Sequence, residues 1–147
     1  MFFGSYEHNV DIKGRLAVPI KFRNALEAGM FITRSVDKCL ALYTDVEFQK
    51  LASEYEALPT TDPDARALQR NFFSGASPCE FDKQGRITVP QELRKYAAIE
   101  GEDVTVMVIG VNNRIEIWSK ERWEHEQEVV EEKGSEMAAR MGNLQLV

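Results

Sequence analysis

The chain has 147 residues, of which 44% are hydrophobic and 29% charged, and its formal net charge is −6. This length and composition are typical of a globular protein that forms one compact unit or two small half-domains. No apolar run is long enough to span a membrane, and the first residues lack the basic region and apolar core of a signal peptide. The sequence therefore predicts a cytoplasmic protein without a membrane segment.

The cysteines and histidines give no sign of a disulfide or a metal centre. Cys39 and Cys79 stand at non-equivalent places in the chain, so we interpret them as reduced, buried thiols. His8 and His125 are far apart, and no metal-ligand spacing surrounds either of them. We expect neither a metal site nor a cofactor.

Charge is distributed unevenly along the chain. Residues 121–147 carry seven acidic and three basic side chains, which is a net charge of −4. Residues 11–23 carry four basic side chains and one acidic side chain, and residues 82–95 carry four and two. An acidic total argues against simple nucleic-acid binding, but the isoelectric point of the whole chain is a poor guide to local potential.

The first third of the chain predicts a hairpin followed by a short helix. A strand over residues 7–10, preceded by an aromatic N-terminus, ends at Asp11, and residues 16–18 form the return strand. A helix then starts at Pro19 and stops at Gly29. Its apolar side chains are expected to face inward: Ile20, Phe22 and Leu26.

The next segment predicts a second hairpin and two helices. Strands over residues 30–33 and 39–43 flank a turn at 35–38. Residues 44–47, Thr-Asp-Val-Glu, form a capping box, and helical spacing of apolar residues continues to Tyr55. After a break in the helical pattern, we expect Asp62 to cap another helix that begins at Pro63 and runs through Phe72. We interpret this segment as the helical linker between two copies.

The second half follows the same order. It begins at Phe72–Gly75, which echoes the N-terminal Phe-Phe-Gly, and it continues with strands over 79–81 and 87–89 and a helix over 90–97. A hairpin of residues 104–110 and 114–118 follows, with its turn at Asn112-Asn113. Ser119 is expected to cap a last helix, whose pattern weakens after Gly134 so that the end is expected to fray.

A nine-residue segment occurs twice and organises the whole chain. Residues 11–19, DIKGRLAVP, return as residues 82–90, DKQGRITVP, 71 residues later and with the same spacing of acid, glycine, arginine and proline. Asp can bond its own backbone at a turn entry, and Gly supplies a positive φ. One such turn is usually only a turn, but two copies with matching flanks indicate an internal duplication. We divide the chain into repeat 1 (5–47), a helical linker (48–75), repeat 2 (76–119) and an acidic C-terminal helix and tail (120–147).

The doubled D-x-x-G-R-[LI]-x-x-P segment, followed in each copy by a short helix, a hairpin and a [Tyr/Trp]-[Thr/Ser] helix cap, resembles the MraZ family of bacterial transcriptional regulators. The resemblance extends from Phe2 to about Trp123. It implies an α+β, β-rich double-split barrel made of two tandem SpoVT–AbrB-type repeats with swapped hairpins. It also implies ring-shaped homo-oligomers that bind direct repeats in promoter DNA. The implied role is repression of the division and cell-wall gene cluster, including the regulator's own gene, on the nucleoid.

The two turns are the candidate DNA-binding site. A hairpin turn projects past its sheet, where Arg can bond bidentately to guanine and Lys can act as a point charge toward phosphate. We predict that Arg15 is the main DNA contact and that Arg86 is a second one, weaker or only structural. The full predicted set of DNA contacts is Lys13, Arg15, Lys83 and Arg86, with Lys21 and Arg23 either adding phosphate contacts or forming solvated surface.

The acids and glycines of the turns are expected to shape them rather than to touch DNA. Asp11 and Asp82 would repel phosphate, so their predicted role is to hold the turn and orient the arginine by pairing with it. Gly14 and Gly85 are expected to permit the reversal. An alternative is that each Asp–Arg pair only stabilises the barrel internally.

Two other classes of function compete with DNA binding. An enzyme could use Asp11 and Asp82 as an acid/base pair, but each lies beside an arginine that would hold it ionised, and no nucleophile or phosphate-binding glycine loop accompanies them. We therefore predict that the chain is not an enzyme. An antitoxin-like protein or a protein-binding scaffold is the remaining alternative, with the acidic tail as its partner-binding segment. In the DNA-binding reading the acidic helix is a solvated face that recognition does not need.

Overall fold

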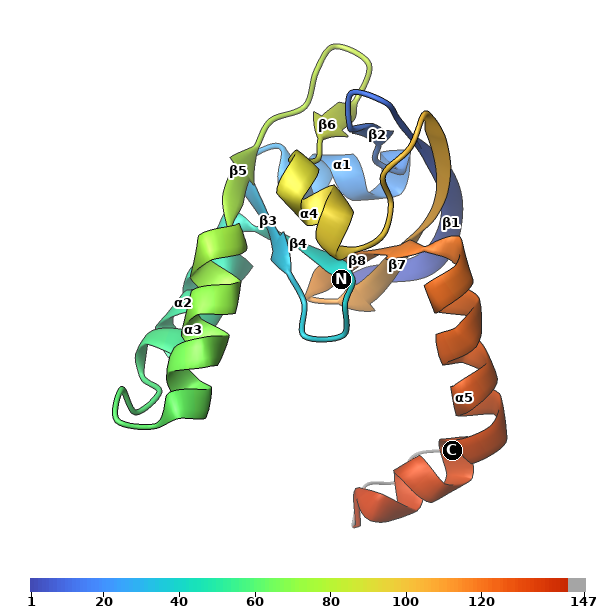
Figure 1. Cartoon of the computed structure of the whole chain (residues 1–147). Coiled ribbons are helices and arrows are strands. Elements are labelled where there is room, and N and C mark those ends of the chain that lie inside the picture. Colours follow the sequence, from blue (N-terminus) through green and yellow to red (C-terminus); the bar gives the residue numbers. More distant parts are fainter. Residues whose placement is uncertain (143–147) are drawn as a thin grey trace.

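The computed structural model describes residues 1–142, and an antiparallel, nearly closed eight-stranded β-barrel forms its centre (Figure 1). The strands lie in the order β5-β3-β4-β8-β7-β1-β2-β6. They are β1 (Phe2–Asp11), β2 (Arg15–Ala17), β3 (Met30–Arg34), β4 (Leu40–Thr44), β5 (Ser77–Cys79), β6 (Arg86–Thr88), β7 (Asp103–Asn112) and β8 (Arg114–Ser119). The helices are α1 (Ile20–Leu26), α2 (Asp45–Glu56), α3 (Pro63–Gly75), α4 (Gln91–Tyr96) and α5 (Lys120–Arg140).

The two repeats interlock, because most strand pairs join one repeat to the other. Strand β1 pairs with β7, β2 with β6, β3 with β5 and β4 with β8. The fully buried side chains come from both repeats in similar numbers: Val10, Leu16, Val18, Leu26, Ile32, Leu40 and Leu42 from the first, and Ile87, Leu93, Ile99, Ile115 and Ile117 from the second. Neither repeat can bury its apolar face alone, so the α+β barrel expected from the sequence is confirmed as one shared unit.

The corresponding strands of the two repeats differ in length. Strand β1 has ten residues and pairs along its whole length with β7, from Phe2 opposite Asn112 to Asp11 opposite Asp103. Its counterpart β5 has three residues and pairs with β3. The turn of repeat 1 therefore leaves a long, firmly paired strand, whereas the turn of repeat 2 follows a short one.

The helix starts predicted from the sequence are confirmed by their caps. Thr44 accepts a hydrogen bond from the backbone N–H of Glu47, and Ser119 accepts one from that of Arg122, at 3.2 Å in both cases. Asp62 caps α3 by accepting from the backbone N–H of Asp64 at 2.9 Å. Each cap satisfies an N–H group that has no partner inside its helix.

Four details of the sequence prediction are wrong. Ile20 is 78% exposed, because the first residue of α1 points away from the barrel while Phe22 and Leu26 fill its interior. Helix α3 continues past Phe72 to Gly75, because the aromatic rings at its end pack against α2. The strand after them is residues 77–79 rather than 79–81. The last helix continues past Gly134 to Arg140.

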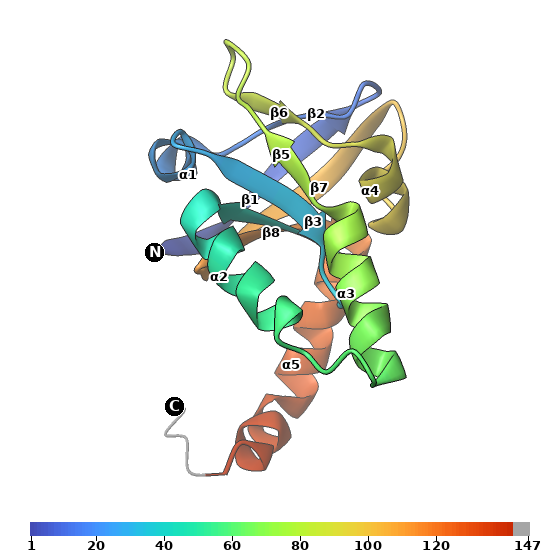
Figure 2. The ribbon, with the colours of Figure 1, turned by 90° about the vertical axis from the view of Figure 1, so that its left-hand side faces the viewer.

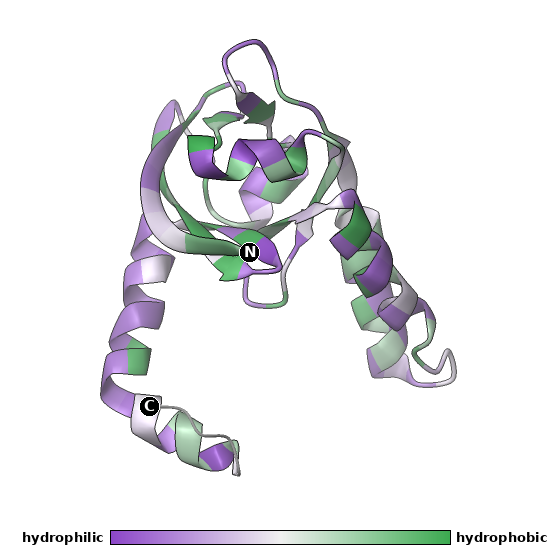
Figure 3. Ribbon diagram, turned by 180° about the vertical axis from the view of Figure 1, so that it is seen from behind, coloured by the Kyte–Doolittle hydropathy of each residue, from purple (hydrophilic) through white to green (hydrophobic). Residues whose placement is uncertain are grey.

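Helices α2, α3 and α5 lie at the opposite end of the barrel from the turns. In Figures 1 and 2 the helices α2, α3 and α5 extend below the barrel, whereas the loops at residues 11–14 and 80–85 rise above β2 and β6. Figure 3 shows that most of α5 is hydrophilic. Within residues 1–142, no helix has the length and apolar character needed to cross a membrane. The acidic helix is thus held away from the basic turns.

Candidate nucleic-acid interface

The first turn (residues 11–15) and the second turn (residues 82–86) have the same backbone geometry. The N–H of Gly14 donates to the carbonyl of Asp11 at 2.9 Å, and Gly14 has a φ of 84°. In the second turn the N–H of Gly85 donates to the carbonyl of Asp82 at 3.1 Å, with a φ of 74°. Side chains strongly disfavour this left-handed conformation, which explains glycine at both positions.

The aspartate of each turn holds both the backbone and the arginine side chain. Asp11 Oδ1 accepts from the N–H groups of Lys13 (3.0 Å) and Arg15 (2.9 Å), and its Oδ2 accepts from Arg15 Nε at 2.6 Å. Asp82 repeats this pattern, with both backbone bonds at 2.9 Å and the bond from Arg86 Nε at 2.8 Å. The carboxylate therefore fixes the position of the guanidinium relative to the turn.

These bonds also lower the pKa of each turn aspartate. The backbone N–H of Arg15 is the largest cause for Asp11, and that of Arg86 is the largest cause for Asp82. Hydrogen bonds from the arginine side chains lower the pKa of both carboxyls further. Both groups are therefore ionised at neutral pH, as an acceptor of several N–H groups must be.

Strands β2 and β6 are the last two strands at one edge of the sheet, and this pair, here called the β2–β6 ribbon, presents both turn arginines on one face. Leu16 pairs with Ile87, and both are fully buried, so the alternating neighbours point outward. Arg15 lies opposite Thr88, and Arg86 lies opposite Ala17. The two arginines are thus diagonal neighbours across the ribbon, about 7–8 Å apart at the backbone.

Each arginine keeps donors available for a ligand. Only Nε of Arg15 and of Arg86 forms a hydrogen bond or ion pair with another group of the described chain. A guanidinium has five N–H donors, so the four on its terminal nitrogens remain. The side chains of Arg15 and Arg86 are 37% and 29% exposed. The ribbon therefore offers two oriented, partly exposed guanidinium groups.

The tips of the two turns differ in chemistry. The first tip has Ile12, which is 63% exposed, followed by Lys13. The second tip has Lys83 followed by Gln84, and both of these are exposed. Each tip thus has one lysine, but at different positions and beside a different neighbour.

The structure places Lys21 and Arg23, the two additional predicted contacts, differently. Lys21 is exposed on α1, and its Nζ lies 5.9 Å from the centre of the Tyr6 ring on β1. Arg23 donates from Nε to the carbonyl of Val18 at 2.7 Å and lies against Gly85. Its Nε is therefore already used within the protein, and the rest of its guanidinium packs against the second turn.

Sequence reasoning did not select Arg94, which occupies the position in repeat 2 that Arg23 has in repeat 1. Its Nε donates to the carbonyl of Val89 at 3.0 Å, and its Nη1 donates to that of Ile12 at 3.3 Å. A signal was available in the duplication itself. In both copies an arginine stands four residues after the proline that ends the repeated segment.

The thiols lie in the interior. Cys39 and Cys79 are both buried and free, as predicted. Burial raises the pKa of Cys39 to about 12 and that of Cys79 to about 11. At neutral pH both are therefore uncharged thiols with little reactivity. Among the described residues, no cluster of three or more His, Cys, Asp or Glu side chains could hold a metal ion.

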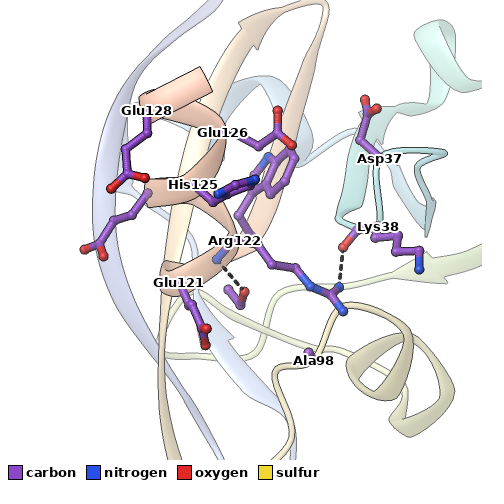
Figure 4. A pocket seen from close by; sticks show the side chains of 11 residues that line it. Asp37, Lys38, Ala98, Glu121, Arg122, His125, Glu126 and Glu128 are labelled. Carbon is purple, nitrogen blue, oxygen red and sulfur yellow. Dashed lines mark hydrogen bonds between the residues drawn. The ribbon is translucent and has the colours of Figure 1, made fainter. Parts of the chain in front are cut away.

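A hollow of about 730 Å³ lies between α5 and the loop that joins β3 and β4 (Figure 4). In it the side chain of Arg122 reaches from α5 to the carbonyl of Lys38, with a bond of 2.8 Å. Several carboxylates line this hollow, and they include Asp37, Glu121 and Glu128. Phosphate would be repelled there, which leaves the ribbon as the candidate nucleic-acid interface.

Comparison with known proteins identifies relatives over nearly the full chain. A family model described as "MraZ protein, putative antitoxin-like" matches the chain twice, at residues 1–71 and 72–144. A protein of Halothermothrix orenii named "Transcriptional regulator MraZ" is 47% identical over 144 residues, which cover 98% of this chain and 99% of the relative. A protein of Ligilactobacillus salivarius with the same name is 47% identical over 141 residues, which cover 96% of each chain.

Proposed function

The chain belongs to the MraZ family, and on this premise we propose that it regulates transcription by binding promoter DNA through the β2–β6 ribbon and its two turns. It is not an enzyme, because its relatives are named as transcriptional regulators. Its proposed target is the promoter of the division and cell-wall gene cluster, which it represses together with its own gene. It acts in the cytoplasm, on the nucleoid.

One observation carries this proposal: two guanidinium groups project from the same face of a two-stranded ribbon, each held by an aspartate. The major groove of B-DNA admits such a ribbon, and arginine bonds bidentately to O6 and N7 of guanine. The Asp–Arg pairs occupy Nε of Arg15 and Arg86 and leave the terminal nitrogens for a base. An arginine that is oriented before binding loses less conformational entropy when it binds.

The lysines of the tips serve a different purpose in the proposal. Lys13 and Lys83 are exposed beside the ribbon, where they contact phosphate as point charges. Lys21 adds a further cation on α1. Such contacts displace counterions from DNA, so they supply affinity without sequence preference and weaken with salt.

The acidic helix contributes nothing to recognition in this account. Helix α5 extends from the end of the barrel opposite the turns (Figure 1) and has no buried residue. Its charge would repel DNA wherever the two approached. We expect a chain that ends near Gly134 to bind the operator at least as well as the full chain, provided that its assembly is unchanged.

Homo-oligomerisation, as a ring, supplies the affinity that one protomer lacks. A chain of net charge −6 offers only a few cations on the ribbon, so one copy binds one DNA site weakly. A ring presents the ribbon repeatedly, and each additional contact on the same DNA becomes intramolecular, a gain of roughly a hundredfold or more. The operator therefore contains direct repeats spaced by about 10 base pairs, one turn of the double helix.

Fluorescence anisotropy with duplexes from the region upstream of the chain's own gene tests this function. Duplexes with one, two and three direct repeats should bind with steeply increasing affinity. Moving one repeat by half a helical turn should remove most of the gain, because one ribbon then faces the wrong side of the DNA. If a single repeat binds as tightly as three, avidity is not the mechanism, and if no duplex binds above background, the proposed function is wrong.

A further inference from the structure

We propose that Arg23 and Arg94 are positioning residues, each of which holds the turn of the opposite repeat in the geometry needed for DNA binding. The inference rests on the proposed function of the turns. It assigns to Arg23 a role other than direct contact with phosphate, and it gives the same role to Arg94. The consequence is that the two DNA-binding turns of one chain are fixed relative to each other.

The contacts of Arg23 connect α1 of repeat 1 to the second turn. Its Nε donates to the carbonyl of Val18 at 2.7 Å, and the N–H of Val18 donates to the carbonyl of Gly85 at 3.2 Å. The guanidinium lies directly against Gly85, where a Cβ atom would come within 2.7 Å of Arg23 Nε. The second turn therefore rests on an arginine from the other repeat.

The contacts of Arg94 repeat this arrangement in the opposite direction. Its Nε donates to the carbonyl of Val89 at 3.0 Å, and the N–H of Val89 donates to the carbonyl of Gly14 at 2.8 Å. A Cβ atom on Gly14 would lie 2.8 Å from Arg94 Nε. Arg94 also reaches the tip of the first turn, where its Nη1 donates to the carbonyl of Ile12 at 3.3 Å.

Because each arginine packs against the turn of the other repeat, there is a second reason for glycine at positions 14 and 85. A positive φ alone would admit asparagine at some cost, but the space beside each glycine is filled by the guanidinium of the other repeat. The flat guanidinium can donate from Nε while its face covers the turn, and a lysine cannot do both. Replacing either arginine by lysine therefore keeps the charge but removes the support.

Hydrogen–deuterium exchange of the full-length protein without DNA tests the positioning role directly. In Arg23→Lys, the amides of Gly85 and Arg86 should exchange about fivefold faster, because the guanidinium that packs against Gly85 and holds Val18, the donor to the Gly85 carbonyl, is lost. The amides of Gly14 and Arg15 should exchange as before. Arg94→Lys should produce the opposite pattern, and a Lys95→Gln control on the same helix should change neither turn.

DNA binding then separates positioning from direct contact. If Arg23 and Arg94 position the turns, each lysine variant should bind about tenfold more weakly than the parent protein, with the same dependence on salt, because no phosphate contact is lost. If either arginine contacted phosphate, its lysine variant would keep most of the affinity.

Several results would overturn the inference. Unchanged exchange in the opposite turn, or equal acceleration in both turns, would show that neither arginine supports the other repeat specifically. Retained DNA affinity in both lysine variants would show that the support does not matter for binding. A parent protein that binds no DNA would contradict the proposed function, while the exchange data would still decide whether the arginines position the turns. If one variant fails to fold, the other gives the mirrored result.

Discussion

The two turns are alike where they meet the barrel and different where they meet solvent. The aspartate, the glycine and the arginine have the same bonds in both copies, and each turn rests on an arginine of the other repeat. The tips share no such constraint: one presents Ile12 and Lys13, and the other presents Lys83 and Gln84. The duplicated residues therefore serve the architecture and the common contact, and the divergent residues are free to distinguish two DNA sequences.

The turns also differ in the length and pairing of the strands that precede them. The first turn leaves ten-residue β1, which is paired with β7 over its whole length, whereas the second follows three-residue β5. A long ladder holds the first turn in addition to its contact with Arg94 on α4. The second turn has less strand pairing and depends more on its contact with Arg23. We expect the first turn to be the more rigid of the two and to contribute more to DNA binding.

The largest expected effect comes from removing a turn arginine. Arg15→Ala should weaken operator binding by about 1–3 kcal/mol if the side chain reads a base. Arg86→Ala should cost less, because the second turn is less firmly held. Titration of labelled operator duplex with each variant measures the difference. Lys50→Ala, which removes an exposed lysine from α2 at the far end of the barrel, serves as the control and should bind normally. A larger loss for Arg86→Ala would reverse the proposed ranking of the turns.

Replacing the glycine of each turn by alanine should lower the free energy of unfolding more in the first turn than in the second. Both alanine variants must adopt a positive φ, at about 1–2 kcal/mol. In Gly14→Ala the new Cβ would also lie 2.6 Å from the carbonyl oxygen of Val89, which is fixed in the barrel. In Gly85→Ala it meets the side chain of Arg23, which can move. Urea unfolding should therefore show the greater loss of stability for Gly14→Ala.

A glycine outside the turns provides the control for that measurement. Gly134 lies inside α5, where a Cβ would meet only Val130 Cγ1 at 3.7 Å. Gly134→Ala should leave the free energy of unfolding unchanged or raise it by up to about 1 kcal/mol, because alanine favours a helix. Equal destabilisation by Gly14→Ala and Gly85→Ala would show that backbone conformation alone explains both glycines.

Exchanging the tips should change sequence preference more than affinity. The double variant Ile12→Lys/Lys13→Gln gives the first tip the residues of the second and leaves the net charge unchanged. Nonspecific binding and its salt slope should remain the same. Discrimination between the natural repeat and a repeat with altered bases should shift by about 1 kcal/mol, since an apolar side chain and an amide favour different bases. Selection of bound duplexes from a randomised pool measures this shift, and an unchanged preference would show that the tips do not read bases.

The smallest effect concerns the pKa of Asp11. The backbone N–H of Arg15 is the largest cause of the lowered pKa, and it remains in Arg15→Ala, whereas the hydrogen bond from the side chain is lost. The pKa of Asp11 should therefore rise in this variant but stay below its ordinary value. Because the pKa is lowered in the folded state, the ionised carboxylate stabilises the turn at every pH above the ordinary carboxyl pKa. This stabilisation is lost as the pH falls through the lowered pKa. Carboxyl NMR titration of both proteins checks the direction. A full return to the ordinary value would make the guanidinium the dominant cause.

Much of the fold could be predicted because its local signals agree with one another. The caps at Thr44, Asp62 and Ser119 and the two D-x-x-G-R turns depend on neighbouring residues only, so a single sequence reveals them. The exposure of Ile20 also follows from local spacing, because Ile20 lies two residues before Phe22 and residues two apart do not share a helix face; its apolar character alone predicts the wrong side. Helical spacing alone therefore places Ile20 on the side of α1 away from Phe22.

The site could be predicted only in part. Arg15 and Arg86 lie beside their partner aspartates in the sequence, so the expected pairing needs no tertiary information. The contact of Arg23 with Gly85, and that of Arg94 with Gly14, join residues more than 60 positions apart. These contacts form only when the two repeats interlock, so the residues that neighbour Arg23 and Arg94 in the sequence do not predict them. Its charge alone therefore predicts that Arg23 contacts phosphate or forms solvated surface.

Chemical footprinting of guanine N7 tests the central claim most directly. Dimethyl sulphate methylates this atom in the major groove, where an arginine of the ribbon would cover it. With the parent protein, guanines in each direct repeat should be protected, and Lys50→Ala should give the same pattern. Protection should disappear in the double variant Arg15→Ala/Arg86→Ala, even at protein concentrations that still retain DNA through phosphate contacts. Unchanged protection in that double variant would contradict the account, because the bases would then be read by another part of the protein.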